Sequence, residues 1–394
     1  MTSMEKTDHR LAVEYTRIVL GMDQLYRSKL VKTGEALFDN EGLTYSLSDE
    51  HPITYSNWSD VKEDLNYLRL RYLDIEDEVR RNYMQQQIGS VLCLADWCAG
   101  VQLPFRDKVR GLLYVNENPL SQAERGELHR RLDVALAGRG YKGSLHEKVQ
   151  AWEAERRVPV AELETVLKEL LAVAKQRVVD RMFPQMADVE VVPEIVHDFP
   201  FNAYCDYVNG KMYLNGDIPF TYEGLKHLVT HECFPGHTTH MRFRELGMQS
   251  GDIPIDASMV VVNTASSSVF EGIADNGIYF IDWLETEDDH IYQIYQQIRS
   301  TSGMNAAHML HAERKPEQEV AQFLAEYAFG EENWIASRLR FFTHPLRSPF
   351  IYTYWRGNEA VKQVYERVAP EDRQRFFQFI YSRMLSADTV KQFV

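Results

Sequence analysis

The stretch THECFPGHTTH, residues 230–240, is the segment of this chain that says most about its fold and chemistry. It begins like the metal-binding signature H-E-x-x-H, in which two histidines four residues apart share one helical face. Here the second histidine, His237, follows His231 by six residues, and Pro235 and Gly236 stand between them. Six residues of unbroken helix turn the chain by about 600°, which leaves the two rings roughly 120° apart. A regular helix therefore cannot direct both rings at one metal ion.

Pro235 and Gly236 can compensate for this spacing. Proline lacks the backbone donor that a helix interior requires, and glycine tolerates almost any turn of the chain, so the pair predicts a kink that returns His237 to the side of His231. Glu232 would then be a carboxylate beside the metal, and His240 has no required role. The alternative is a histidine-rich helix end at which Pro-Gly is an ordinary stop signal.

A third ligand is indicated by SSSVFEGIADNG, residues 266–277, which predicts a helix that starts after the serines. Glu271 lies thirty-four residues after His237, and a glutamate from a following helix is the usual third ligand beside two histidines. The alternative is a solvated helix charge, but Phe270 and Ile273 favour a partly buried position. The sequence thus predicts a metal site of His231, His237 and Glu271. Zinc suits these ligands, and so do other divalent transition metals.

The composition restricts the partners of the chain. Its 394 residues are 44% hydrophobic and 26% charged, which suits a globular protein with a large core. The formal net charge of −15 argues against broad affinity for nucleic acid or an anionic membrane, because both depend on clustered Lys and Arg. A peptide or small-molecule substrate is the better expectation, and the sequence leaves the oligomeric state open.

The first thirty residues mix charges into their apolar positions, so we expect neither a signal peptide nor a spanning helix, and we expect a cytoplasmic protein. Four scattered cysteines predict no disulfide framework. Cys233, beside Glu232, has no separate base to activate it as a nucleophile, so we expect it to pack.

Residues 1–185 predict an N-terminal helical region, because apolar residues recur at three- and four-residue spacing. Residues 186–394 predict a metal-site region with a small β-ribbon, a helix from about Thr221 and further helices. We expect the two regions to form one continuous fold around a cleft. The ribbon lies at about 189–214, where Asn209-Gly210 favours a two-residue hairpin. It would cover the cleft or offer an edge strand to a peptide. The expected fold class is mainly α.

Four segments occur here in the order seen in a known bacterial family: AYCDYVNGKMYLN, HECFPGH, FEGIAD and YWRG. From about Asn202 to the C-terminus the chain resembles the family called domain of unknown function 885, whose motif is H-E-x-x-P-G-H followed by E-G-W-A. Ile273 stands at the tryptophan position and Thr238 follows the second histidine, which leaves the substrate open. The resemblance implies a zincin-like helical metallohydrolase with a small β-ribbon beside the active-site helix.

The resemblance also implies roles for residues. His231, His237 and Glu271 would bind zinc and Glu232 would be the general base. Tyr354 and, less directly, His311 would act in catalysis. Tyr352 and Arg347 are further candidates that the sequence leaves undecided.

The predicted reaction is hydrolysis of a peptide or other amide bond by metal-activated water, with Glu232 taking the proton. Two alternatives remain from the sequence. A metal beside a carboxylate also suits a lyase or another proton-abstraction enzyme that acts on a small metabolite. The third possibility is a binding protein that keeps the scaffold without catalysis.

Overall fold

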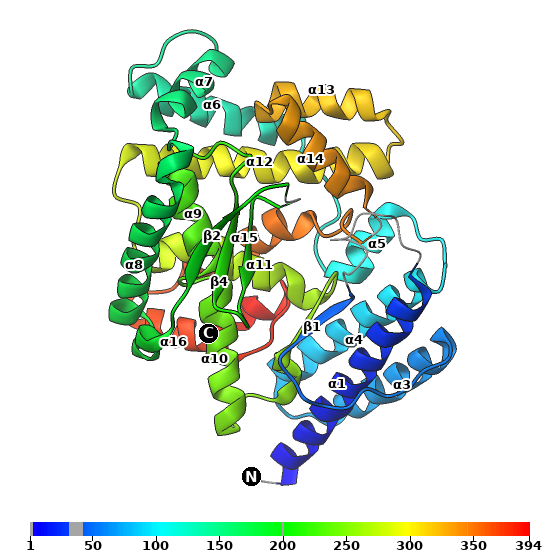
Figure 1. Cartoon of the computed structure of the whole chain (residues 1–394). Helices are drawn as coiled ribbons and strands as arrows, with labels where there is room; N and C mark the ends of the chain where they lie inside the picture. The colour runs from blue at the N-terminus through cyan, green and yellow to red at the C-terminus, as the bar shows by residue number, and fades with distance from the viewer. Residues whose placement is uncertain (1–2, 31–41, 199–200, 345) are drawn as a thin grey trace. The chain divides into compact units, whose positions relative to one another are not determined.

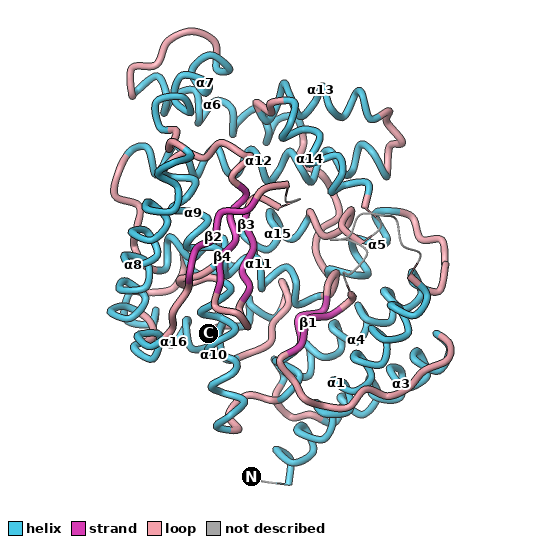
Figure 2. The backbone as a smooth tube through the Cα atoms, viewed as in Figure 1, coloured by secondary structure: helices cyan, strands magenta, loops and turns pink. Residues whose placement is uncertain are grey.

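The structure, a computed structural model, describes residues 3–30, 42–198, 201–344 and 346–394. These residues are mainly helical, as the sequence predicts, and they also form two small sheets where one was expected (Figures 1 and 2). The chain forms two compact units that are each discontinuous in sequence. The first comprises Met1–Glu117, Phe243–Phe270 and Glu359–Val394, and the second comprises Asn118–Arg242 and Glu271–Asn358. These boundaries differ from the predicted division between residues 185 and 186.

The first unit contains the N-terminal helices and the end of the chain. Helix α3 illustrates why these helices form. Its apolar residues Val61, Leu65 and Leu68 recur at helical spacing, so they share one face, and that face is buried. Arg80 and Asp256 form a buried bidentate ion pair, with both N–O distances 2.8 Å. The elements wholly in this unit are α1 Ser3–Lys29, β1 Thr44–Ser46, α3 Trp58–Arg71, α4 Glu78–Cys98, α5 Phe105–Leu113, β5 Met259–Val261 and α16 Arg373–Ser382. Strands β1 and β5 pair antiparallel.

The second unit contains the remaining helices and a three-stranded sheet. Helix α6 begins at a capping box of Ser121 and Glu124 and ends at Gly138. The elements wholly in this unit are α6 Gln122–Gly138, α7 Leu145–Arg156, α8 Leu163–Arg181, β2 Val192–Val196, β3 Ala203–Asp206, β4 Lys211–Asn215, α9 Tyr222–Glu232, α12 Glu287–His311, α13 Glu317–Ala328 and α14 Glu332–Thr343. Three helices pass from one unit into the other, namely α10 His237–Ser250, α11 Ala265–Phe280 and α15 Tyr352–Tyr365.

The three-stranded sheet has the order β2-β4-β3 (Figure 2). Strands β3 and β4 form the predicted antiparallel hairpin, and β2 pairs parallel to β4. The predicted two-residue loop is wrong, because Asp206 pairs with Lys211 and leaves four residues, 207–210, between the strands. Helix α9 contacts β3, and α8 contacts β2 and α9. The sheet and α8 therefore support the helix that leads into the motif.

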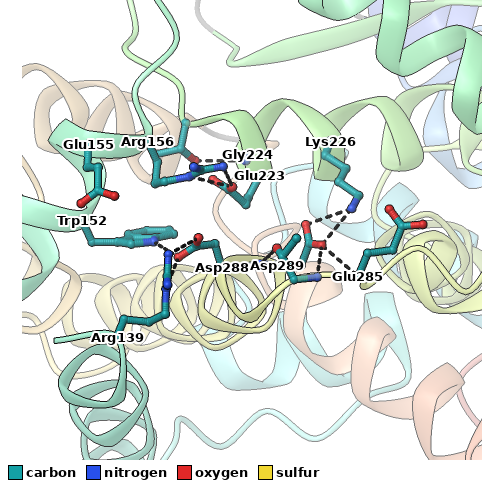
Figure 3. Close-up of polar contacts among 12 residues, drawn as sticks. Arg139, Trp152, Glu155, Arg156, Glu223, Gly224, Lys226, Glu285, Asp288 and Asp289 are labelled. Atoms are coloured by element: carbon teal, nitrogen blue, oxygen red, sulfur yellow. Dashed lines mark hydrogen bonds and ion pairs between the residues drawn. The ribbon is translucent and has the colours of Figure 1, made fainter. Parts of the chain in front are cut away.

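Two ion pairs link α9 to neighbouring helices (Figure 3). Lys226 of α9 contacts Asp289 of α12 at 2.9 Å, with both side chains at most 4% exposed. Arg156 of α7 pairs with Glu223, in the first turn of α9. Burying an ion without a partner is costly, so these pairs restrict where α9 can lie.

Two further predictions concern the described part of the chain. All four cysteines are free thiols there, as expected. None of its helices combines the length and the apolar character that crossing a bilayer requires.

Candidate metal centre

The break predicted between the two motif histidines is present. Helix α9 ends at Glu232 and α10 begins at His237, and between them the Phe234–Pro235 peptide bond is cis. The chain at Gly236 passes so close to the preceding turn that an added Cβ would lie 1.7 Å from the carbonyl oxygen of His231. Only glycine lacks this atom, so the motif glycine is required for close backbone approach.

The break brings the three predicted ligands together. The Oε2 atom of Glu271 lies 3.4 Å from Nε2 of His231 and 3.8 Å from Nε2 of His237. The centroids of the two imidazole rings are 4.8 Å apart and the rings are nearly perpendicular. His231 and Glu271 are buried, and His237 is partly buried.

This donor set fits a zinc ion. Zinc in proteins takes imidazole nitrogens and carboxylate oxygens at about 2.1 Å, so neighbouring ligand atoms of a tetrahedral site lie about 3.4 Å apart. The candidate ligand atoms of these three residues all lie within 4.8 Å of one another, and their rings are not coplanar. Three protein ligands leave one position of a tetrahedron open, as catalytic sites require.

Asp275 fixes the orientation of His231. Its Oδ1 lies 2.8 Å from Nδ1 of His231 and 3.6 Å from Nε2 of His227, one turn earlier on α9. An Nδ1–H that donates to Asp275 leaves the lone pair of Nε2 free for a metal, and this tautomer follows from the hydrogen bond. Asp275 is therefore an orienting group behind the ligand.

Asp275 and His231 stabilise each other's charged forms, the carboxylate and the imidazolium. Burial alone would raise the pKa of Asp275, but hydrogen bonds with His227 and His231 lower it well below its usual range. Burial disfavours the charged form of His231, yet Asp275 and Glu271 raise the pKa of this imidazole well above its ordinary value. Without a metal, the site therefore attracts positive charge at Nε2, which is the position that a cation would take.

Glu232 lies at the end of α9 with its carboxyl group buried. Burial is the main cause that raises the pKa of Glu232 to about 7, and the negative charge of Glu271 adds to it. His231 and a hydrogen bond from the backbone of Cys205, on edge strand β3, act in the opposite direction. A carboxyl group with a pKa near neutrality suits proton transfer at physiological pH.

Tyr354, in the first turn of α15, belongs to the same neighbourhood. Burial is the largest cause that raises the pKa of its hydroxyl, and the nearby carboxylates of Glu271 and Glu232 raise it further. The phenol is therefore neutral and able to donate a hydrogen bond close to the three ligands.

Three other residues singled out in the sequence make contacts or are placed as follows. Nε2 of His311 lies 2.7 Å from the carbonyl oxygen of Phe342, where it makes a hydrogen bond. Neither His311 nor His240 belongs to the groups of described residues that could hold a metal. The hydroxyl of buried Tyr352 lies 3.5 Å from Nδ1 of His308.

Cys233 is buried, and burial raises the pKa of its thiol well above the ordinary value. A thiol held in its protonated form is a poor nucleophile, which agrees with the packing role predicted for Cys233.

Two residues that contact the candidate ligands were not predicted from the sequence. Asp275 follows Glu271 by four residues on α11, and His227 precedes His231 by four residues on α9. Such spacing places each pair on one helical face, so it is the signal that points to them. A search for a carboxylate one turn beyond the predicted third ligand would have found Asp275.

No protein-family model matches the chain, and no curated protein matches it. Among solved structures, the "putative lipoprotein" of Colwellia psychrerythraea aligns with a TM-score of 0.55 and 12% sequence identity, over 84% of this chain and 65% of that one. The "putative lipoprotein of unknown function" of Shewanella oneidensis aligns with a TM-score of 0.53 and 10% identity, over 85% and 71% of the two chains. This chain thus spans about two thirds of the length of each. At this identity, the likeness concerns the mainly helical fold alone.

Proposed function

We propose that this chain is a metal-dependent hydrolase of a peptide or other amide bond, with zinc as the favoured metal. The observation that carries the proposal is the convergence of His231, His237 and Glu271, with ligand atoms within 4.8 Å of one another. The buried carboxyl group of Glu232 next to this group adds the base that hydrolysis needs. The zincin-like architecture, and the likeness to the H-E-x-x-P-G-H family, belong to the same proposal.

In the proposed hydrolysis, each residue has a separate role. The metal, when bound, polarises the substrate carbonyl and lowers the pKa of a water molecule. Glu232 accepts a proton from the attacking water and delivers it to the leaving nitrogen. The hydroxyl of Tyr354 donates a hydrogen bond to the oxygen on which negative charge develops. Asp275 holds the ring of His231 in place throughout.

Edge strand β3 lies next to the base, because the backbone of Cys205 hydrogen-bonds with Glu232. An extended substrate can add to such an edge through backbone hydrogen bonds, which favours a peptide over a compact metabolite. The cytoplasmic location expected from the sequence also remains a prediction, and cell fractionation tests it.

Metal content and turnover test the proposal together. We expect purified protein to bind one zinc ion, and we expect His231→Ala and His237→Ala to lose it. Glu232→Gln should keep the zinc and lose kcat by about 10²–10⁴-fold, as expected when a general base is removed. His290→Ala is the matched control, because His290 is exposed on α12, and it should keep both zinc and activity.

A screen of peptides and small amides by mass spectrometry distinguishes the reactions. Hydrolysis adds the mass of one water to the products, whereas elimination does not. Full activity in Glu232→Gln would remove this residue from the mechanism. Failure of the zinc-loaded protein to turn over any amide would leave the lyase or the binding protein as the better reading.

A further inference from the structure

Two arginines of the second unit, Arg338 and Arg347, lie against one aromatic ring. Arg338 is on α14, and Arg347 precedes α15. The guanidinium carbons of Arg338 and Arg347 lie 5.6 and 5.7 Å from the ring centroid of Phe341, which is buried. Arg338 also lies 6.0 Å from the ring of Trp334. Both guanidinium groups are therefore held by the same aromatic surface.

Tyr354 links this pair to the metal ligands. The rings of Phe350 and Tyr354 pack with centroids 5.7 Å apart, and Arg347 lies 5.5 Å from the ring of Phe350. The hydroxyl of Tyr354 interacts electrostatically with Arg347 and Arg338, and it also interacts with Glu271 and Glu232. The arginines and the ligand group thus share one neighbour, the hydroxyl proposed to donate to the substrate.

The charge of Arg338 is not balanced within the described part of the chain. No carboxylate there forms an ion pair with Arg338, and its buried Nε makes no hydrogen bond. Arg299, which interacts electrostatically with Arg338, carries the same sign of charge. Burial lowers the pKa of the Arg338 and Arg347 guanidinium groups, because the charged form is disfavoured there. The protein as a whole is acidic, so this positive region is unusual for its sequence.

We propose that Arg338, with Arg347 beside it, binds a carboxylate of the substrate and so places the bond to be cleaved at the metal ligands. A guanidinium presents a planar fork of donors that matches a carboxylate, and stacking on an aromatic ring holds this fork in a fixed plane. The substrate class is therefore an acidic peptide or acylamino acid. This inference rests on the proposed function, since it specifies the substrate of the same site.

The carboxylate has two sources, the C-terminus of a peptide or an acidic side chain. Paired probes separate them. One pair is the tripeptide Ala-Ala-Phe with a free or an amidated C-terminus. The other pair is an N-acetylated, C-amidated tripeptide with Glu or Gln at its centre. If Arg338 recognises the C-terminal carboxylate, the amidated tripeptide binds more weakly than the free one. If it recognises an acidic side chain, the Gln peptide binds more weakly than the Glu peptide.

The variants are Arg338→Gln, Arg338→Lys and the control Arg340→Gln, whose arginine is exposed on the same helix. We expect Arg338→Gln to raise KM for the acidic probe by about 10–100-fold, the effect of losing a charged hydrogen bond, with kcat within about threefold. KM for the neutral probe should change little. Arg338→Lys should restore part of the difference, because it keeps the charge. Arg340→Gln should match the parent protein.

Calorimetric binding to zinc-loaded Glu232→Gln makes the test independent of turnover. Tighter binding of the acidic probe, lost when Arg338→Gln is added, supports the carboxylate site even if no amide is cleaved, in which case only the proposed function fails. Equal affinity for acidic and neutral probes would overturn the inference. An equal loss for both probes in Arg338→Gln would also overturn it, because it would assign Arg338 a packing role.

Discussion

Asp275 shows how a residue outside the candidate ligand set can fix the orientation of one of its members. It accepts a hydrogen bond from His231 at 2.8 Å and lies one turn from Glu271, so the same helix supplies a ligand and the group that orients another ligand. A carboxylate behind a ligating imidazole fixes its tautomer and increases its basicity. The geometry of the candidate metal site therefore depends on two positions of α11, Glu271 as a candidate ligand and Asp275 as the group that orients His231.

We predict that Asp275→Asn weakens zinc binding by about 10–100-fold, since an amide can still accept the hydrogen bond but carries no charge. Competition with a chromogenic chelator measures the Kd. Asp282→Asn is the control, because Asp282 is exposed and pairs with Arg181. An unchanged zinc Kd in Asp275→Asn would show that the hydrogen bond alone, without the charge, is sufficient.

The candidate ligands were predictable from the sequence because they lie in short motifs with informative spacing. His231, His237 and Glu271 converge as expected. Asp275 and His227 were not predicted, because a single carboxylate or histidine on a helix is common and gains meaning only from the partner that tertiary structure brings near. The family resemblance suggests a catalytic role for His311. In the structure its ring makes a hydrogen bond with the backbone carbonyl of Phe342.

At the scale of elements, helices were more predictable than strand pairing. The capping box of Ser121 and Glu124 and the N-cap at Thr221 are local signals. Both begin helices, and the one at Thr221 begins where the sequence predicts. The hairpin loop differs because the Asp206 carboxylate accepts hydrogen bonds from the backbone and side chain of Asn209, which stabilises a four-residue turn. The parallel pairing of β2 with β4 joins segments separated along the chain, so no local pattern encodes it.

The position of α9 depends on the buried pair of Lys226 and Asp289. Burial alone would raise the pKa of Asp289, but hydrogen bonds from Lys226 and from the backbone N–H groups of Glu285 and Thr286 lower it below its ordinary value. Lys226 also lies 4.7 Å from the ring centroid of Trp283. The charged carboxylate thus stabilises both the start of α12 and the helix that carries His231 (Figure 3).

We predict that Asp289→Asn lowers the free energy of unfolding at pH 7 by about 3–5 kcal/mol, because it leaves a buried lysine without its partner. A carboxylate with a lowered pKa stabilises the fold above its unfolded pKa of about 3.9, and this contribution disappears as the pH falls through the folded pKa. The difference between the two proteins should therefore be large at pH 7 and shrink below about pH 4. Urea denaturation at several pH values measures it.

Glu319→Gln is the control for this prediction. Glu319 pairs with Lys315, but both side chains are more than 40% exposed, so removing the pair should cost less than about 1 kcal/mol. A difference for Asp289→Asn that stays constant down to low pH would contradict the assignment of the stabilisation to the charge.

At the scale of the whole molecule, the candidate metal ligands lie in one unit, whereas two of the helices that carry them extend into both units. His231, His237 and Glu271 all belong to the second unit. Helices α10 and α11, which carry His237 and Glu271, continue into the first unit. Helix formation is cooperative along one segment, so a ligand that fixes one end of a helix also opposes the opening of its neighbouring turns. Metal binding in one unit should therefore influence the other through continuous backbone.

We predict that zinc slows hydrogen exchange in α9 and also in residues 243–250, the part of α10 that belongs to the first unit. Zinc at about 1,000 times its Kd stabilises the folded chain by about 4 kcal/mol, which is enough to slow exchange by openings that release the metal. Mass spectrometry of exchanged peptides measures the effect. His237→Ala, which removes the ligand at the start of α10, should abolish the response in both segments. Protection that stops at Arg242 would show that α10 opens independently on the two sides of the boundary, and that the units respond to the metal separately.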